Sequence, residues 1–88
     1  MVEREVIVKN ETGIHARPAS LLVQTANEFE ADIKLIKEDE EANAKSIMGV
    51  MSLAVSVDNQ IIIKAEGVEE EEAVEAIVKL IESNFGEE

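Results

Sequence analysis

The residues with the clearest capacity for chemistry lie in one short segment, residues 12–20, which read TGIHARPAS. Gly13 supplies backbone freedom for a turn. Pro18 fits the first turn of a helix, where the N–H group that proline lacks would have no partner. We therefore expect a helix that starts directly after His15, with His15 as its N-terminal cap and Arg17 in its first turn.

Such a helix start is suited to binding a phosphate group. The backbone N–H groups of Ala16 and Arg17 have no partner inside the helix, and the helix dipole favours negative charge at this end. The guanidinium of Arg17 can add charge-assisted hydrogen bonds to phosphate oxygens. The imidazole of His15 can be the nucleophile of a phosphoryl transfer, which needs mainly in-line positioning and stabilisation of charge.

The same residues also allow a simpler interpretation. His15 and Arg17 can be ordinary polar residues at a helix start, since a single histidine is more often structural than catalytic. A metal site is disfavoured because the chain has one histidine, no cysteine and no carboxylates at a ligand spacing. The lack of cysteine also excludes disulfides and thiol chemistry. We expect no metal and no cofactor.

Hydrophobic periodicity predicts the elements that position this segment. Apolar residues at every second position indicate strands, and apolar residues three or four positions apart indicate helices. The expected elements are a strand over 2–9, a helix from 16 with Ala19, Leu22, Val23, Ala26 and Phe29 on its apolar face, strands over 32–37 and 42–44, a short helix over 47–53, a strand over 60–66 and a helix that opens at 69–72. The acidic stretch 38–41 is predicted as a turn, and Gly86 as the C-cap of the last helix.

This order of elements, βαββαβα with short connections, predicts an α+β fold. Short connections favour an antiparallel sheet that is covered on one face by helices. The 88 residues are enough for a single domain, which we expect to span 1–88, and leave no room for a second core.

Charge narrows the classes of partner. The chain has 8 basic and 20 acidic residues, which gives a formal net charge of −12. Binding of nucleic acid or of an anionic membrane surface needs clustered Lys and Arg, so neither is expected as a partner. No secretory signal and no apolar run long enough to span a membrane is visible. We expect a cytoplasmic protein whose partners are other proteins.

Two motifs together point to a family. Residues 12–19 read TGIHARPA and residues 44–53 read AKSIMGVMSL, and this pair at this spacing resembles HPr, the histidine-containing phosphocarriers of the phosphoenolpyruvate-dependent sugar phosphotransferase system. The resemblance covers essentially the whole chain and fits the Gram-positive type. It implies an open-faced β-sandwich with sheet order 1-4-2-3 and three helices on one face.

The resemblance also implies a function. His15 would accept a phosphoryl group on Nδ1 from enzyme I and pass it to the IIA domain of a sugar permease, with Arg17 stabilising the group in transfer. Such a protein is a covalent carrier, not an enzyme, and is expected to be a monomer. Two alternatives remain: a regulatory interaction module in catabolite repression or nitrogen-type phosphotransfer, and a ferredoxin-like domain that binds a small molecule, which the order of elements alone would favour.

Ser46 precedes the predicted short helix and can serve as its N-cap. The resemblance adds a second role, regulatory phosphorylation by HPr kinase/phosphorylase. The added charge would lie at a helix N-terminus and on a docking surface. In the family the seryl-phosphorylated form can also bind a transcription regulator of catabolite repression.

The short helix is expected to bury only one face. If Val50 and Leu53 face the core, the side chains of Ile47, Met48 and Met51 cannot all be buried. Flexible Met side chains on a surface suit docking with several partners. With Ser20 and Leu21 they are predicted to form a docking surface beside His15, where Arg17 and Lys45 supply the positive charge.

A second apolar group is predicted on the outward face of the sheet. Ile7, Ile36 and Ile62 alternate out of phase with the core positions, on strands that the sheet order 1-4-2-3 makes neighbours. We expect a cross-strand cluster that stabilises the sheet. A self-association surface is the alternative.

Overall fold

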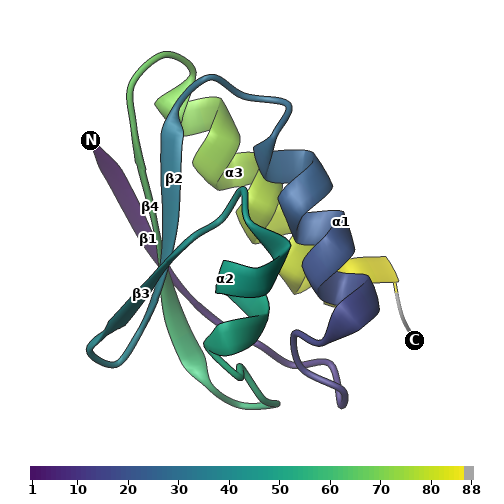
Figure 1. Cartoon of the computed structure of the whole chain (residues 1–88). Coiled ribbons are helices and arrows are strands. Elements are labelled where there is room, and N and C mark those ends of the chain that lie inside the picture. The colour runs from purple at the N-terminus through teal and green to yellow at the C-terminus, as the bar shows by residue number, and fades with distance from the viewer. Residues whose placement is uncertain (87–88) are drawn as a thin grey trace.

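The computed structural model describes residues 1–86, which form a four-stranded sheet and three α-helices (Figure 1). The elements are β1 (Val2–Ile7), α1 (Ala16–Ala26), β2 (Asp32–Lys37), β3 (Glu40–Asn43), α2 (Ile47–Ser52), β4 (Gln60–Glu66), α3 (Glu70–Glu82) and a 3₁₀ turn, Asn84–Gly86. The predicted order βαββαβα is therefore confirmed.

The sheet is antiparallel throughout and has the order β1-β4-β2-β3. All three helices lie on one face of it, as Figure 1 shows, and the other face is left open. The two central strands, β4 and β2, have the alternating apolar pattern that the sequence predicts: Ile33, Leu35, Ile61 and Ile63 are at most 1% exposed. The α+β class, the sheet order 1-4-2-3 and the one-sided helices are confirmed.

Each long helix buries one apolar stripe against the sheet. In α1 the stripe is Ala19, Leu22, Val23 and Ala26, with Pro18 also buried. In α3 it is Ala73, Val74, Ile77, Val78 and Ile81. The predicted face of α1 is confirmed, except that Phe29 lies beyond the end of α1 and is only half-buried. The stripe that the sequence predicts for the last helix also includes Leu80, which is only half-buried. Burial of aliphatic side chains at about 25 cal/mol per Å² is the main stabilising contribution in a chain with only two aromatic residues.

Four predicted boundaries are wrong. Strand β1 ends at Ile7, two residues before the predicted end, and α2 ends at Ser52 with Leu53 as its C-cap. Strand β3 begins at Glu40, inside the acidic stretch predicted as a turn, because the hairpin needs only a two-residue connection: Lys37 pairs with Glu40, and Glu38 takes a left-handed φ of 56°. Helix α3 ends at Glu82 with Ser83 as its C-cap, so Gly86 is not the cap.

The chain turns after α3 so that Phe85 becomes buried. Asn84 and Phe85 both adopt left-handed φ values, 57° and 56°, and the Phe85 ring is only 4% exposed. A large aromatic side chain that loses this much contact with water stabilises the fold by about 2 kcal/mol. This burial is of the same size as the combined strain of the two left-handed residues, at about 1 kcal/mol each.

The outward face of the sheet carries the predicted isoleucines. Ile62 lies directly opposite Ile36 across β4 and β2, and both are half-buried. Ile7 pairs with Gln60 and is 47% exposed, so it extends the cluster diagonally. Cross-strand apolar pairs of this kind typically stabilise a sheet by up to about 1 kcal/mol.

An Ile62→Lys variant is therefore expected to lose about 1 kcal/mol in free energy of unfolding and to unfold at a lower temperature. Its mass in solution should be unchanged. Gln60→Lys is the matched control, because it adds the same charge at the next outward position of β4 without removing an apolar side chain. Thermal unfolding and light scattering measure the two quantities. A change of mass without a change of unfolding temperature would assign the cluster to self-association instead.

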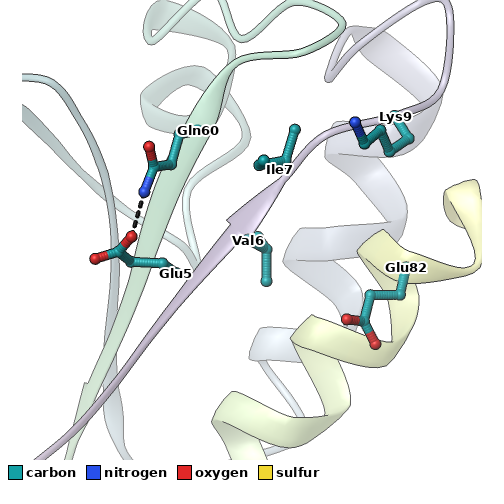
Figure 2. Close-up of a pocket in the computed structure, with 6 residues that line it drawn as sticks. All are labelled: Glu5, Val6, Ile7, Lys9, Gln60 and Glu82. Carbon is teal, nitrogen blue, oxygen red and sulfur yellow. Dashed lines mark hydrogen bonds between the residues drawn. The ribbon is translucent and has the colours of Figure 1, made fainter.

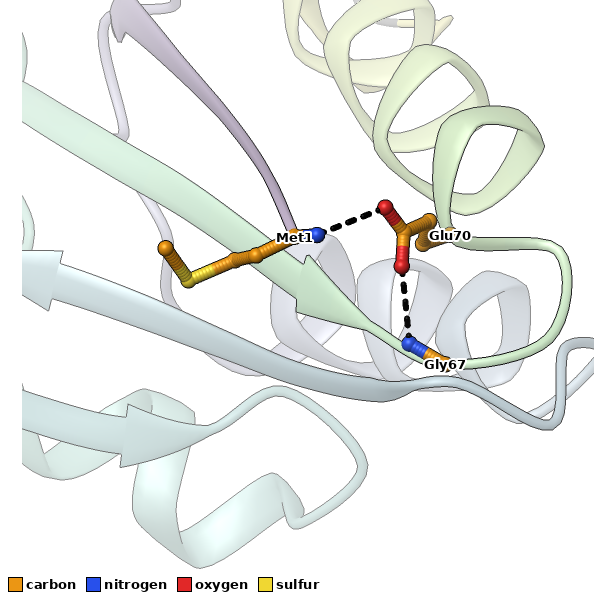
Figure 3. A network of polar contacts seen from close by, with 3 residues as sticks. All are labelled: Met1, Gly67 and Glu70. Atoms are coloured by element: carbon orange, nitrogen blue, oxygen red, sulfur yellow. Dashed lines mark hydrogen bonds and ion pairs between the residues drawn. The ribbon is translucent and has the colours of Figure 1, made fainter.

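The N-terminus is fixed to the start of α3 (Figure 3). The α-amino group of Met1 lies 2.8 Å from Glu70 Oε2, and the other carboxylate oxygen of Glu70 accepts a hydrogen bond from Gly67 N at 3.0 Å. The hydrogen bond with Glu70 raises the pKa of the amine above 8.0, and the same bond together with that from Gly67 lowers the pKa of the Glu70 carboxyl below 4.5.

This contact predicts a pH dependence of stability. The raised amine pKa contributes stability that is fully present below 8.0 and is lost as pH rises through the folded value. The lowered carboxyl pKa contributes stability that is present above 4.5 and is lost as pH falls through the folded value. In protein that retains Met1, the unfolding temperature of Glu70→Gln should fall less than that of wild type on passing to alkaline pH. Exposed Glu71→Gln is the control and should behave as wild type does.

Candidate functional site

His15 is the N-cap residue of α1, as the sequence predicts. Its backbone is extended (φ −112°, ψ −154°), its carbonyl accepts the first helical hydrogen bond from Ala19 N at 2.7 Å, and its side chain makes no capping bond. The residue is exposed. The backbone at the start of α1 therefore sets the position of the imidazole, which is exposed and accessible to a partner protein.

The surroundings of His15 have the helix-start geometry on which the phosphate-binding prediction depends. Helix α1 begins at Ala16, so the N–H groups of Ala16 and Arg17 lie in its first turn and have no partner inside the helix. Pro18, which has no N–H group, occupies the third helical position and is buried. Arg17 is exposed and makes no hydrogen bond or ion pair with any residue from 1 to 86. Its guanidinium is free to bind an anion at the helix start.

Two loops form the support beneath His15. The N–H group of Ile14 donates to the Val55 carbonyl at 3.0 Å, and the side chain of Ile14 is buried. The residue directly before His15 is therefore held by both a hydrogen bond and core packing. From the sequence, residues 10–13 are recognisable as a turn, but their contact with the loop after α2 is not.

Ser46 is the N-cap of α2, which confirms the predicted capping role. Its Oγ accepts a hydrogen bond from Gly49 N at 3.1 Å. The side chain is half-buried rather than enclosed, and exposed residues follow it in the chain. The hydroxyl is thus engaged in capping, and its phosphorylation stays a prediction.

Helix α2 buries one face and exposes the other. Val50 and Leu53 are 0% and 3% exposed, whereas Ile47, Met48 and Met51 are 45%, 83% and 42% exposed. The prediction that Val50 and Leu53 face the core is confirmed. The prediction that Ile47, Met48 and Met51 are not all buried is also confirmed. Ser20 and Leu21 on α1 are half-buried, and α1 packs against α2. The use of this surface for docking stays a prediction.

Two lysines that could have served partners are used within the fold. Lys45 Nζ donates to the Phe29 carbonyl at 2.7 Å, just after α1 ends. Lys37 Nζ donates to the carbonyls of Leu53 and Ala54, both at 3.0 Å, at the end of α2. Cations at helix C-termini satisfy free carbonyls and oppose the negative end of the dipole. In its predicted docking role, Lys45 can therefore use only the N–H donors that Phe29 does not occupy. Arg17 has no partner in residues 1–86, so all its donors are available.

A surface hollow lies outside the segment 12–20 that contains His15. It has a volume of about 540 Å³ and is lined by Glu5, Val6, Ile7, Lys9, Gln60 and Glu82, at the edge strand β1 and the end of α3 (Figure 2). Its polar groups are already paired in part, since Gln60 Nε2 donates to Glu5 Oε2. None of its lining residues belongs to the segment 12–20, so it offers that site no enclosed substrate pocket.

The described part of the chain contains neither a candidate membrane-spanning helix nor a candidate metal cluster. Among residues 1–86, no helix has both the length and the apolar character needed to cross a membrane. Within the same range, no group of three or more His, Cys, Asp or Glu side chains is arranged to hold a metal ion.

Comparison with known proteins identifies the family. The model of the PTS HPr component phosphorylation site matches residues 2–83. The chain belongs to the HPr family. The HPr-like protein Crh of Halalkalibacterium halodurans is 50% identical over 82 residues, which cover 93% of this chain and 98% of that relative. The phosphocarrier protein HPr of Treponema pallidum is 43% identical over 88 residues and covers 100% of both chains.

Solved structures of HPr proteins have the same fold. The crystal structure of HPr from Thermoanaerobacter tengcongensis aligns with a TM-score of 0.97 and 56% identity, over 100% of this chain and 99% of that one. The family is one of phosphocarriers of the phosphotransferase system, not of catalytic enzymes. The ferredoxin-like small-molecule binder is therefore excluded as the family of this chain.

The state of association is less uniform among relatives. A crystal structure of Crh from Bacillus subtilis, 46% identical with a TM-score of 0.77 over 94% of this chain and 95% of that one, is described as a dimer with a swapped domain. The expected monomer is therefore not confirmed for this HPr-family chain and stays a prediction.

Proposed function

We propose that this chain accepts a phosphoryl group on Nδ1 of His15 from enzyme I and passes it to the IIA domain of a sugar permease. The observation that carries the proposal is the juxtaposition at the start of α1 of an exposed histidine, two N–H groups without helical partners and an arginine without a partner in residues 1–86. Family membership supports the same chemistry.

The proposed step needs little from the protein beyond position and charge. The lone pair of unprotonated Nδ1 attacks phosphorus, a P–N bond forms, and the bond between phosphorus and the donor group of enzyme I breaks. Transfer to IIA repeats this step, with His15 as the leaving group. The Arg17 guanidinium and the N–H groups of Ala16 and Arg17 stabilise the phosphoryl oxygens during both transfers. An open surface site suits this role because each partner must bring its own reactive group to His15.

Docking is proposed to use the apolar surface beside this site. The exposed side chains of Ile47, Met48 and Met51 on α2, with the half-buried Ser20 and Leu21 on α1, offer an adaptable surface in a chain of net charge −12. Methionine side chains adapt to differently shaped surfaces. That property fits a carrier that must bind a donor and an acceptor in turn.

Regulation is proposed at Ser46. A phosphoryl group on its Oγ would lie at the start of α2, next to Ile47 and Met48, and would add about 1.5 to 2 negative charges there. Helix α2 itself would tolerate this charge at its N-terminus. The docking of enzyme I, by contrast, would lose apolar contact, so phosphorylation of His15 should slow. HPr kinase/phosphorylase is the proposed modifying enzyme.

The second candidate function is a regulatory module without a direct role in sugar transport. The relatives favour it in part, because HPr-like Crh proteins stand beside HPr among them, and Crh of Bacillus subtilis is described as the catabolite repression HPr. In that function the partner of the Ser46-phosphorylated form would be a transcription regulator of catabolite repression.

A two-stage assay separates the two functions. The protein is first phosphorylated with phosphoenolpyruvate and enzyme I, then mixed with a purified IIA domain, and the phosphoryl group on each protein is followed by intact mass. Passage of the group from His15 to IIA supports the carrier. A stable His15 phosphate that no IIA domain removes, together with phosphorylation of wild type but not of Ser46→Ala by the kinase and ATP, would favour the regulatory module.

A further inference from the structure

Asn10 is the buried polar residue closest in the chain to His15. It is 4% exposed and is the one polar side chain in the buried set among residues 1–86. Its Nδ2 donates to the Gly13 carbonyl at 2.8 Å and to Thr12 Oγ1 at 3.2 Å. Its own carbonyl accepts from Gly13 N at 3.1 Å. The side chain and backbone of one residue thus close the turn from both sides.

The far side of this turn is held by the loop after α2. Ile14 N donates to the Val55 carbonyl. Gly13 lies so close to the backbone of Val55 and Ser56 that a Cβ atom would not fit there. The turn is therefore held by two hydrogen bonds, one from the Asn10 carboxamide to the Gly13 carbonyl and one from Ile14 N to the Val55 carbonyl. His15 follows directly, and its orientation is set by where this turn ends.

The supporting loop is itself hydrogen-bonded to Val8, the residue directly after strand β1. Asp58 N donates to the Val8 carbonyl at 2.7 Å, and Val8 N donates to the Asn59 carbonyl at 3.0 Å. The Asn59 side chain closes the loop by accepting from Ser56 N at 2.8 Å. Through the loop after α2, these bonds connect the turn before His15 to the end of strand β1.

We infer that Asn10 is a positioning residue for phosphoryl transfer at His15, an inference that rests on the proposed function. Its carboxamide never contacts the phosphoryl group. It fixes the backbone at Gly13, two residues before the nucleophile, and so sets the line along which Nδ1 meets phosphorus. Misplacement of reacting groups by about 1 Å can slow a reaction about 100-fold, so loosening this turn should be visible in the rate.

Two substitutions test the role of the N–H donors. Asn10→Asp keeps the shape of the side chain and removes both donors, and Asn10→Ala removes the side chain without adding charge. Ile63→Val serves as the control. Ile63 is fully buried in β4, so this substitution weakens the core without changing the turn. All proteins are compared at a temperature where unfolding curves show them fully folded.

The measurement is the rate of His15 phosphorylation by enzyme I as a function of enzyme I concentration, with hydrogen exchange of the Ile14 amide as a second readout. Both Asn10 variants should lower the maximal rate about 10- to 100-fold with little change in the concentration for half-maximal rate, because the docking surface is intact. Exchange of the Ile14 amide should accelerate in both. Ile63→Val should leave the rate near that of wild type.

The outcomes separate this inference from the proposed function. If wild type itself is not phosphorylated, the proposed function fails. If wild type is phosphorylated and the Asn10 variants keep the maximal rate of Ile63→Val, the positioning role is overturned, whatever their stability. A variant that affects only the half-maximal concentration would assign Asn10 to docking and would also overturn the inference.

Discussion

Replacement of Arg17 by alanine is expected to slow phosphorylation of His15 about 100-fold or more while leaving the folded state intact. Removal of one donor that stabilises developing charge typically reduces a rate about 100- to 1,000-fold, and an arginine facing a transferring phosphoryl group can contribute more. Arg17 is exposed and has no partner in residues 1–86, so its loss should change the free energy of unfolding by less than about 0.5 kcal/mol.

Two variants sharpen this prediction. Arg17→Lys keeps the charge but loses the planar fork of donors, so an intermediate rate is expected. Arg4→Ala on β1 removes one positive charge elsewhere and leaves the site unchanged, so it measures the effect of net charge alone. Single-turnover kinetics with enzyme I provide the rates. Equal rates for Arg17→Ala and Arg4→Ala would show that Arg17 acts only through the overall charge.

Replacement of Gly13 by alanine is expected to destabilise the fold by about 3 kcal/mol. Gly13 has a left-handed φ of +64°, and an added Cβ would lie 2.4 Å from the Val55 carbonyl oxygen and 2.8 Å from Ser56 Cα. Both neighbours are backbone atoms, so they cannot move aside as a side chain would. The clash adds to the strain of about 1 kcal/mol that alanine has in this conformation.

Gly86→Ala is the matched control for the clash. Its φ is +77°, also left-handed, but apart from its chain neighbours no atom of residues 1–86 lies within 4 Å of the position that a Cβ would occupy. This variant should therefore show only the conformational strain, about 1 kcal/mol. Urea unfolding at equilibrium measures both. A loss for Gly13→Ala no larger than that for Gly86→Ala would mean that the two loops separate easily and do not support His15.

Local patterns explain why much of the fold was predictable. The alternation of apolar residues in 32–37 and 60–66 gives the two central strands with the observed bounds. These strands are buried on one face only, so burial leaves a clear signature of period two. His15 and Ser46 were predicted as N-caps because their neighbours, Pro18 and a short apolar run, mark helix starts locally.

The errors arose where strand pairing or core packing overrides the local pattern of residue types. Glu40 and Glu41 lie in an acidic stretch without apolar alternation, yet they belong to the edge strand β3, where charged side chains face solvent. Gly86 has the composition of a helix cap, but burial of Phe85 turns the chain before it. Strand β3 is decided by its pairing with the neighbouring strand β2, and the turn at Phe85 by packing of its ring in the core.

The same limit applies to the candidate site. No local pattern indicates that Lys45 reaches the Phe29 carbonyl, sixteen residues away, or that Asn10 is buried. A sequence of type Asn-x-x-Gly specifies a turn without saying what covers it. The chemistry at His15 could therefore be proposed from the sequence, whereas the frame that orients His15 could not.

The most direct test of the central claim is phosphorylation with purified enzyme I and phosphoenolpyruvate, read by intact mass, on wild type and His15→Ala. The account predicts that wild type gains one acid-labile phosphoryl group and that His15→Ala gains none. His15→Ala should unfold as wild type does, since the side chain is exposed and makes no capping bond. A phosphoryl group that persists in His15→Ala, or none on wild type with several active enzymes I, would contradict the account.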